Sequence, residues 1–133
     1  MSQAAINQYV KNRMATATPA QLVAMLFDGA IAAMRRAADA EASGRRPEAS
    51  EQLVKAQRIV TELRCSLDFE AGGRVARELD RIYEFIWHQL VAANVRRDPL
   101  LVMRCVELLL PLRDAWGTAC LGQPQVPGER MSA

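Results

Sequence analysis

The chain has few aromatic residues, few cysteines and no long apolar run, and each shortage excludes a class of protein. Aromatic side chains make up 5% of the 133 residues, so a base-stacking series for nucleic acid is missing. Nowhere do about 18 apolar residues follow one another, so no membrane-spanning helix is predicted. Cys65, Cys105 and Cys120 are odd in number and lack CxxC spacing, which disfavours a disulfide framework or a zinc site and fits a reducing cytosol.

The charged and potentially catalytic residues do not occur in the patterns that nucleic-acid binding or metal-dependent catalysis requires. Lys and Arg total 17 against 15 Asp and Glu, a net charge of +2, so no basic stripe for nucleic acid is expected. His88 is the single histidine and cannot supply the two Glu-x-x-His pairs of a di-iron bundle. We therefore expect no enzyme, no metal and no cofactor. A cryptic helical enzyme or metal protein is the alternative, which metal analysis of the purified protein would test.

What the chain does contain is a strong helix-start signal. The Thr18 hydroxyl can accept a hydrogen bond from an N–H of the first turn, Pro19 suits the first helical position, and Gln21 can complete a capping box. A helix is therefore predicted from Pro19 to residue 43. Gly29 inside it costs ~1 kcal/mol relative to alanine, which indicates a notch where a neighbouring helix approaches closely.

Three further helices are predicted from apolar residues that recur at spacings of three and four. They cover residues 47–69, 74–96 and 99–120, with glycines between the first two and Asp98 capping the last. Helices of this length with short connections fold most economically as an antiparallel four-helix bundle. We therefore predict an all-α chain with an N-terminal arm or short helix (1–15), a four-helix bundle (16–120) and a disordered C-terminal tail (121–133).

The apolar spacing places Leu22 and Val75 in the core and leaves more apolar residues than one core needs. In the fourth predicted helix only Arg104 and Glu107 interrupt an apolar run from residue 100 to 110. The surplus residues widen the core, form a self-association face, or line grooves for another chain. As candidates for partner binding we select Ile59, Tyr83, Trp87, Val91, Leu101, Val102 and Met103.

One stretch carries a specific resemblance. Tyr9, then Thr16-Ala17-Thr18-Pro19, then Met25-Leu26-Phe27-Asp28-Gly29-Ala30-Ile31 resemble the flagellin-specific export chaperones of the FliS type. The similarity continues in order to Trp116. Further landmarks are Lys55-Ala56-Gln57, Glu62-Leu63, Ser66-Leu67-Asp68, Gly72-Gly73, Tyr83, Leu90, Ala93-Asn94, Asp98 and Leu112-Arg113-Asp114-Ala115-Trp116.

The resemblance implies a cytoplasmic, non-enzymatic chaperone for type III flagellar export. Such a protein binds the C-terminal segment of flagellin, prevents premature polymerisation and hands the subunit to the export gate. It also implies that the N-terminal arm around Ile6 and Tyr9 regulates binding and contacts the export gate, and that a regulatory protein of flagellar assembly is a further partner. Ile6 and Phe27 stand where many relatives have tyrosine, so hydrogen bonds that those hydroxyls make are not expected here. The alternative is a self-associating bundle, a homodimer when free, without a flagellin client.

Overall fold

The structure, a computed structural model of the chain, describes residues 2–6 and 17–122. Four long helices follow one another in these ranges: α2 (Pro19–Ala42), α3 (Arg46–Cys65), α4 (Phe69–Arg96) and α5 (Pro99–Gly122). Residues 3–6 form a helical turn, at whose start the Ser2 hydroxyl accepts a hydrogen bond from the Ala5 N–H at 3.1 Å. The predicted all-α fold is confirmed. Most of the predicted tail lies outside the described residues, although α5 reaches two residues beyond the predicted boundary.

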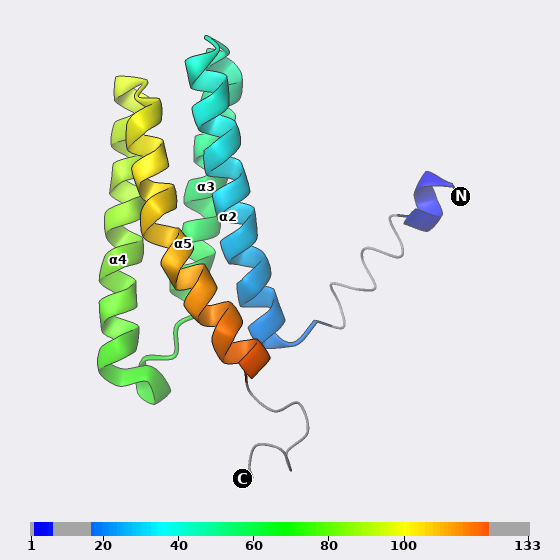
Figure 1. Cartoon of the computed structure of the whole chain (residues 1–133), viewed down its shortest axis with the longest axis vertical. Coiled ribbons are helices and arrows are strands. Elements are labelled where there is room, and N and C mark those ends of the chain that lie inside the picture. The colour runs from blue at the N-terminus through cyan, green and yellow to red at the C-terminus, as the bar shows by residue number, and fades with distance from the viewer. Residues whose placement is uncertain (1, 7–16, 123–133) are drawn as a thin grey trace.

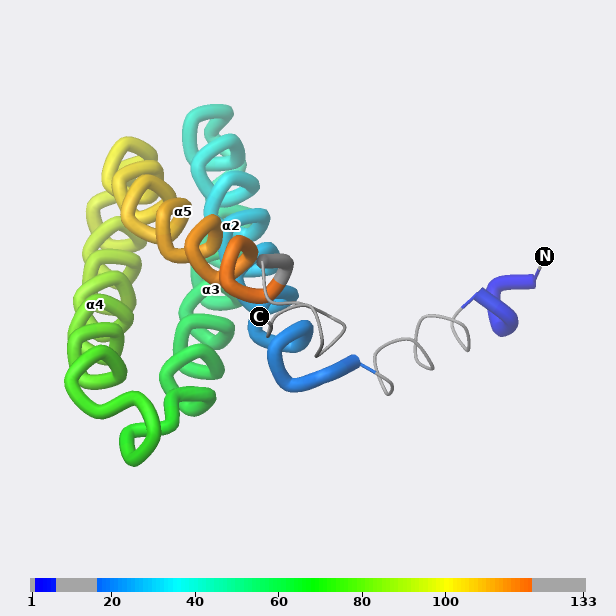
Figure 2. Tube along the Cα trace, turned by 60° about the horizontal axis from the view of Figure 1, so that its bottom comes forward, coloured from blue at the N-terminus to red at the C-terminus, as the bar shows by residue number. Residues whose placement is uncertain are grey.

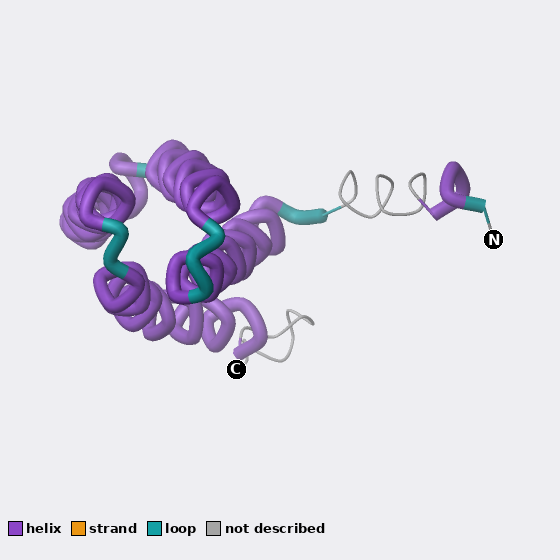
Figure 3. The backbone as a smooth tube through the Cα atoms, turned by 90° about the horizontal axis from the view of Figure 1, so that it is seen from above, coloured by secondary structure: helices purple, strands orange, loops and turns teal. Residues whose placement is uncertain are grey.

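The four helices form an antiparallel ring in which each one packs against two neighbours. Contacts join α2 to α3, α3 to α4, α4 to α5, and α5 back to α2. Figure 1 shows α2 and α4 running up the molecule while α3 and α5 run down it. Figure 3, seen from above, shows the ring end on. The connections 43–45 and 97–98 therefore lie at one end of the bundle, and the link between α3 and α4 lies at the other.

Two of the helix starts agree with the prediction from sequence. At α2 the Gln21 N–H donates to Thr18 Oγ1 at 3.1 Å, and the Thr18 N–H donates to Gln21 Oε1 at 2.9 Å. This is the predicted capping box. At α5 the Asp98 carboxylate accepts hydrogen bonds from the Leu100 and Leu101 N–H groups at 3.0 and 3.2 Å.

The predicted boundary between α3 and α4 is wrong. We expected the second helix to reach residue 69 and the third to start at 74, but α3 ends at Cys65 and α4 begins at Phe69. The reason is Asp68, whose carboxylate caps the first turn of α4 through the Glu70 and Ala71 N–H groups at 3.1 and 3.0 Å. The expected glycine break is instead a kink inside α4, at Gly73, where φ is 51° and ψ is −122°.

The core lies inside the ring and combines a small-residue face of α2 with larger side chains of the other helices. Most of the α2 residues that are buried are alanines. Large, fully buried side chains from all four helices fill the core: Ile31, Met34, Leu53, Leu63, Ile86, Leu90 and Leu109. Two predicted core residues are not there, because Leu22 and Val75 are 41% and 63% exposed. Each lies in the first two turns of its helix, at the end of the bundle away from the ring's centre.

The C-terminal half of α5 leaves α4 and crosses to the start of α2, as Figures 1 and 2 show. It is fixed there by the Trp116 indole N–H, which donates to the Ala20 carbonyl at 3.0 Å. The Trp116 ring also lies 6.5 Å from the Phe27 ring, centre to centre. A surface ion pair of 3.6 Å joins Arg113 to Asp28. The helix continues through Pro111.

Candidate functional site

The described residues do not assemble a reactive centre. No group of three or more His, Cys, Asp or Glu side chains in the described part could hold a metal ion. His88 is exposed and lies 4.0 Å from the Glu84 carboxylate on the next turn. The buried Cys105 thiol has a pKa raised to about 12 because burial disfavours the thiolate. A thiol of that kind is unreactive at neutral pH.

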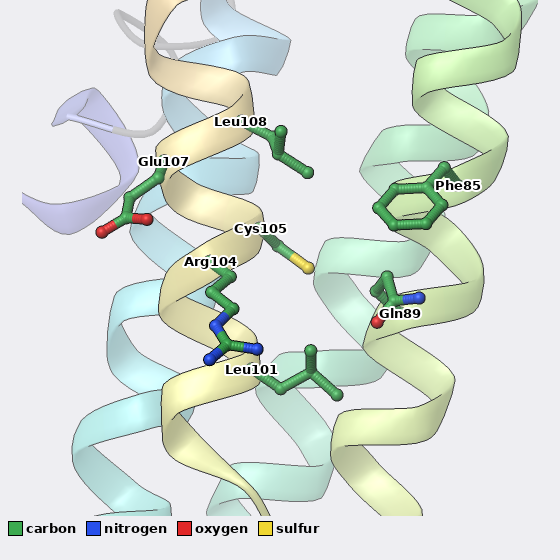
Figure 4. Close-up of a pocket in the computed structure, with 7 residues that line it drawn as sticks. All are labelled: Phe85, Gln89, Leu101, Arg104, Cys105, Glu107 and Leu108. Atoms are coloured by element: carbon green, nitrogen blue, oxygen red, sulfur yellow. The ribbon is translucent and has the colours of Figure 1, made fainter.

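A groove of about 420 Å³ lies between α4 and α5. It forms where α5 begins to separate from α4 on its way to α2 (Figure 1). Figure 4 shows side chains of both helices bordering it. Its lining is Phe85, Gln89, Leu101, Arg104, Cys105, Glu107 and Leu108. We call it the α4–α5 groove.

Apolar side chains form the walls of the α4–α5 groove. Phe85 projects from α4 toward α5, and Leu101 and Leu108 project from α5 toward α4 (Figure 4). Phe85 is 52% exposed and Leu108 is 41% exposed. Covering a large apolar side chain completely stabilises a complex by roughly 1.5–3 kcal/mol, so a partner that covers both gains a substantial part of that amount. Paired exposed groups of this kind mark interaction sites more often than single ones do.

The polar groups of the α4–α5 groove have no partners in the described part of the chain. Arg104 and Glu107 form no ion pair or hydrogen bond there, and neither does the Gln89 amide. Figure 4 shows that Glu107 points away from α4, whereas Gln89 lies on α4 below Phe85. Among the described residues, the groove therefore presents an unpaired cation, an unpaired carboxylate and an unpaired amide beside its apolar walls.

A second groove, of about 340 Å³, lies between α3 and α4 and is more polar. Arg46 donates hydrogen bonds to the Glu41 carboxylate and to the Asn94 side chain, and to the Asn94 carbonyl at 2.7 Å. The Asn94 amide in turn donates to the Ser50 hydroxyl at 3.4 Å. These bonds join three helices at one end of the bundle and satisfy one another, so the network holds the frame together.

A third groove, of about 640 Å³, lies between the start of α2 and the end of α3. Leu22 and Met25 are 41% and 44% exposed in it, and Cys65 contributes an exposed thiol. It sits next to the place where Trp116 joins α5 to α2. This groove is the second exposed apolar surface of the described residues.

The seven candidates chosen from sequence do not form one patch. Tyr83 and Val102 are only 3% and 1% exposed, so they belong to the core and are not surplus. Leu101 lines the α4–α5 groove and Val91 the α3–α4 groove. The remaining three, Ile59, Trp87 and Met103, are partly buried against the core.

Ile59 has a further role, because its Cδ1 lies 3.4 Å from where a Cβ on Gly29 would be. That distance is an ordinary van der Waals contact with a side-chain tip, so the structure shows no helix approach that requires glycine at this position. Of the two arm residues, Ile6 is 40% exposed in the turn 3–6. Tyr9 lies outside the described residues.

Sequence reasoning missed Phe85, Gln89 and Leu108 as lining residues of the α4–α5 groove. The signal was available in the spacing of α4, because Phe85 and Gln89 are one turn apart on a face that the buried series Ile86, Leu90 and Ala93 does not use. We assigned the extra apolar face of this helix to Trp87 and Val91. That face is the one nearest α3, as the contact of Val91 with the α3–α4 groove shows.

The described residues form an all-α bundle with exposed apolar grooves between its helices, an architecture suited to binding other proteins. The chain matches the family model for the flagellar protein FliS over residues 1–123. It is 34% identical over 107 residues to the flagellar secretion chaperone FliS of Vibrio cholerae, which covers 80% of this chain and 79% of the relative. The corresponding protein of Salmonella typhimurium is 35% identical over 108 residues, 80% of each chain.

The Bacillus subtilis flagellar secretion chaperone FliS is 31% identical over 111 residues, which cover 84% of this chain and 82% of the relative. The chain belongs to the FliS family. That is a family of flagellar secretion chaperones and not of enzymes, so a client protein from the flagellar system is implied. None of the helices in residues 2–6 and 17–122 is long and apolar enough to cross a membrane.

Proposed function

We propose that this chain binds the C-terminal segment of flagellin in the cytoplasm, keeps it from polymerising prematurely, and delivers it to the flagellar export gate. The observation that carries the proposal is membership of a family of flagellar secretion chaperones, matched over residues 1–123. The exposed apolar walls of the α4–α5 groove support it, because a chaperone of this kind needs a surface that shields apolar client residues.

The proposed mechanism is coupled folding and binding. The client segment is disordered when free and forms helices whose apolar faces lie in the grooves of the bundle. Ordering the segment costs about 2–5 kcal/mol of the gross interaction energy, so the complex stays releasable at the export gate. Leu101 in the α4–α5 groove, Val91 in the α3–α4 groove, and the partly exposed Ile59, Trp87 and Met103 are the predicted contacts that remain from the sequence.

The N-terminal arm has a separate proposed role. Ile6 and Tyr9 contact the export gate or cover part of the client surface, and a regulatory protein of flagellar assembly is a further partner. Ile6 is exposed in its helical turn, which suits an apolar contact with another protein. Removal of residues 1–15 should change either flagellin affinity or binding to the export-gate protein. Unchanged affinity for both would refute the role of the arm.

The direct test is a titration of the purified chain with flagellin and with flagellin that lacks its C-terminal segment. We expect binding of the first and none of the second. Equal binding of both, or of neither, would contradict the proposal. Sedimentation of the free chain at micromolar concentration belongs in the same experiment, since the exposed groove can also pair two copies into a homodimer. Flagellin should dissociate such a dimer if both occupy the same groove.

A further inference from the structure

The two halves of α5 are held in different ways. In the first half, four side chains are no more than 1% exposed: Val102, Cys105, Val106 and Leu109. None of the residues 110–120 is buried, and Figure 2 shows this second half crossing to the start of α2. Burial of an apolar face provides most of the stability of a helix in a bundle. The first half of α5 is therefore fixed in the core, whereas the second half is attached at the surface.

Pro111 lies at the boundary between these halves. The helix continues through it, but a proline donates no backbone hydrogen bond and its ring crowds the carbonyl four residues earlier, here that of Glu107. Bending of α5 is therefore easiest at this point. Gly117 weakens the second half further, since glycine is a poor helix former and no atom lies within 4 Å of a Cβ placed there. Residues 112–120 thus form a segment that can move while the first half stays in place.

The polar contacts between residues 112–120 and α2 can be replaced by water. The Trp116 indole N–H donates to the Ala20 carbonyl at 3.0 Å, and Arg113 pairs with Asp28 at 3.6 Å. Ala20 lies inside α2, where its carbonyl keeps its own helical hydrogen bond when the indole leaves. The Asp28 side chain is 66% exposed, so water replaces its ion pair at little cost. Neither contact therefore leaves a buried polar group unpaired when the segment detaches.

The α2 side chain that the segment covers is Phe27. It is 2% exposed, and its ring lies 6.5 Å from the Trp116 ring and 6.4 Å from the Tyr83 ring. Val23 stands one turn before Phe27 and lines the apolar groove of about 640 Å³ between α2 and α3. Removal of Trp116 from its seat would uncover Phe27 beside this groove and join the two into one larger apolar surface.

We propose that residues 112–120 are an autoinhibitory latch. In the closed state, which the structure shows, Trp116 covers Phe27. In the open state, reached by bending at Pro111, Phe27 and the groove between α2 and α3 form one surface that a client can occupy. The present occupant indicates the chemistry of its competitor, which places a large apolar side chain where the Trp116 ring now lies. The inference rests on the proposed function, because that competitor is taken to belong to the C-terminal segment of flagellin.

The latch sets the client affinity through the fraction of molecules in which it is open. For a client that binds only the open state, the apparent dissociation constant is the intrinsic one divided by the open fraction. Closure also shields Phe27 from water in the free chain, where a larger apolar patch would promote association. Weakening the latch should therefore tighten client binding, which is the opposite of what the loss of a client contact does.

The experiment titrates the full chain with a fluorescently labelled C-terminal segment of the flagellin from the same organism. Trp116→Phe keeps an aromatic ring but loses the hydrogen bond to the Ala20 carbonyl, so it raises the open fraction. The segment should then bind about two- to ten-fold more tightly. Equal or weaker binding would overturn the inference, because a client contact or a purely structural residue does not inhibit binding.

Amide hydrogen exchange of the unmodified chain gives a second readout. Saturation with the flagellin segment should make residues 112–120 exchange faster, since the client displaces the latch, while residues 100–110 keep their protection. Unchanged or slower exchange in residues 112–120 would show that the client binds without opening the latch, and this too would overturn the inference.

Asp80→Asn is the matched control for a general loss of stability. It weakens the pairing of Arg64 with Asp80, and both residues lie outside the latch and outside the lining of the groove between α2 and α3. Its affinity should stay within about two-fold of the unmodified chain. A gain equal to that of Trp116→Phe would overturn the inference. Circular dichroism confirms that each variant is folded.

The titrations separate the latch from the proposed function. If the unmodified chain and Trp116→Phe both fail to bind the segment, the proposed function is refuted, and the competition with it. If the unmodified chain binds and Trp116→Phe binds no more tightly, the latch alone is refuted.

Discussion

At the residue scale, Tyr83 shows why helical spacing misassigned part of the site. Spacing alone put this tyrosine beyond the core series of its helix, yet it is buried and lies 6.4 Å from the Phe27 ring. Phe27 belongs to a different helix, α2, and is itself 2% exposed. Contacts with another helix therefore decide whether Tyr83 is buried, and the spacing within one helix does not reveal them.

Burial of Tyr83 predicts a loss of stability at high pH. Burial raises the pKa of its phenol from 10.0 to about 12, since the phenolate is disfavoured out of water. The unfolded chain therefore releases its proton first as the pH rises above 10, and the free energy of unfolding falls until about pH 12. Tyr83→Phe should lack this component, so its stability relative to the unmodified chain should rise from pH 9 to 11. Urea unfolding across this range measures the difference, and a constant difference would contradict the prediction.

The pair of Arg64 and Asp80 predicts the opposite pH dependence. The Arg64 guanidinium donates to the Asp80 carboxylate at 2.8 and 3.2 Å, and this lowers the pKa of Asp80 below its ordinary value of 3.8. The stabilisation is complete above that value and is lost as the pH falls through the lowered pKa. Because both groups are partly exposed, Asp80→Asn should cost less than about 1 kcal/mol at pH 7. The cost should disappear in urea titrations near pH 2.

At the element scale, caps and breaks were predictable where the signal was local and unambiguous. Thr18 with Gln21, and Asp98 before proline, both act as expected because their hydrogen bonds are made within one turn. Asp68 is also a local cap, but an apolar series that continues to Leu67 made α3 look longer than it is. The groove between α4 and α5 could not be predicted, since it depends on where α5 is fixed at its far end.

Gly29 and Gly73 should respond to alanine with opposite signs. At Gly73 φ is 51° and ψ is −122°, a combination outside the αL region that alanine adopts only at a cost of order 1–3 kcal/mol, although no atom lies within 4 Å of the added Cβ. Gly29 lies in regular helix, and the added Cβ would make an ordinary contact with Ile59 at 3.4 Å. Gly29→Ala should therefore stabilise the chain by about 0.5–1 kcal/mol. Thermal unfolding of both variants measures this, and a loss of stability at Gly29 would mean that Ile59 cannot adjust.

At the scale of the whole molecule, the attachment of α5 to α2 closes the ring and sets the shape of the α4–α5 groove. Trp116 makes that attachment through its hydrogen bond to Ala20 and its contact with Phe27. The family resemblance included Trp116, but sequence offered no reason for it, because its partners lie near the other end of the chain. Contacts of that range follow only from the arrangement of all four helices.

Trp116→Phe should loosen this attachment and leave the rest of the bundle intact. The variant keeps an aromatic ring near Phe27 but loses the hydrogen bond to the Ala20 carbonyl, at a cost of about 0.5–1.5 kcal/mol. Amide hydrogen exchange should become faster in residues 112–120 and stay unchanged in 100–110. Uniformly faster exchange along α5 would show instead that the helix is held as one unit.

The Trp116 contact also means that the fold depends more on which helices are neighbours around the ring than on their order along the chain. Because α2 starts where α5 finishes, a short bridge from residue 122 to residue 17 would join them covalently, and new termini could be opened at the exposed Gly44 turn. A circular permutant built in this way would retain every pair of neighbouring helices and bring α5 and α2 together as a continuous hairpin.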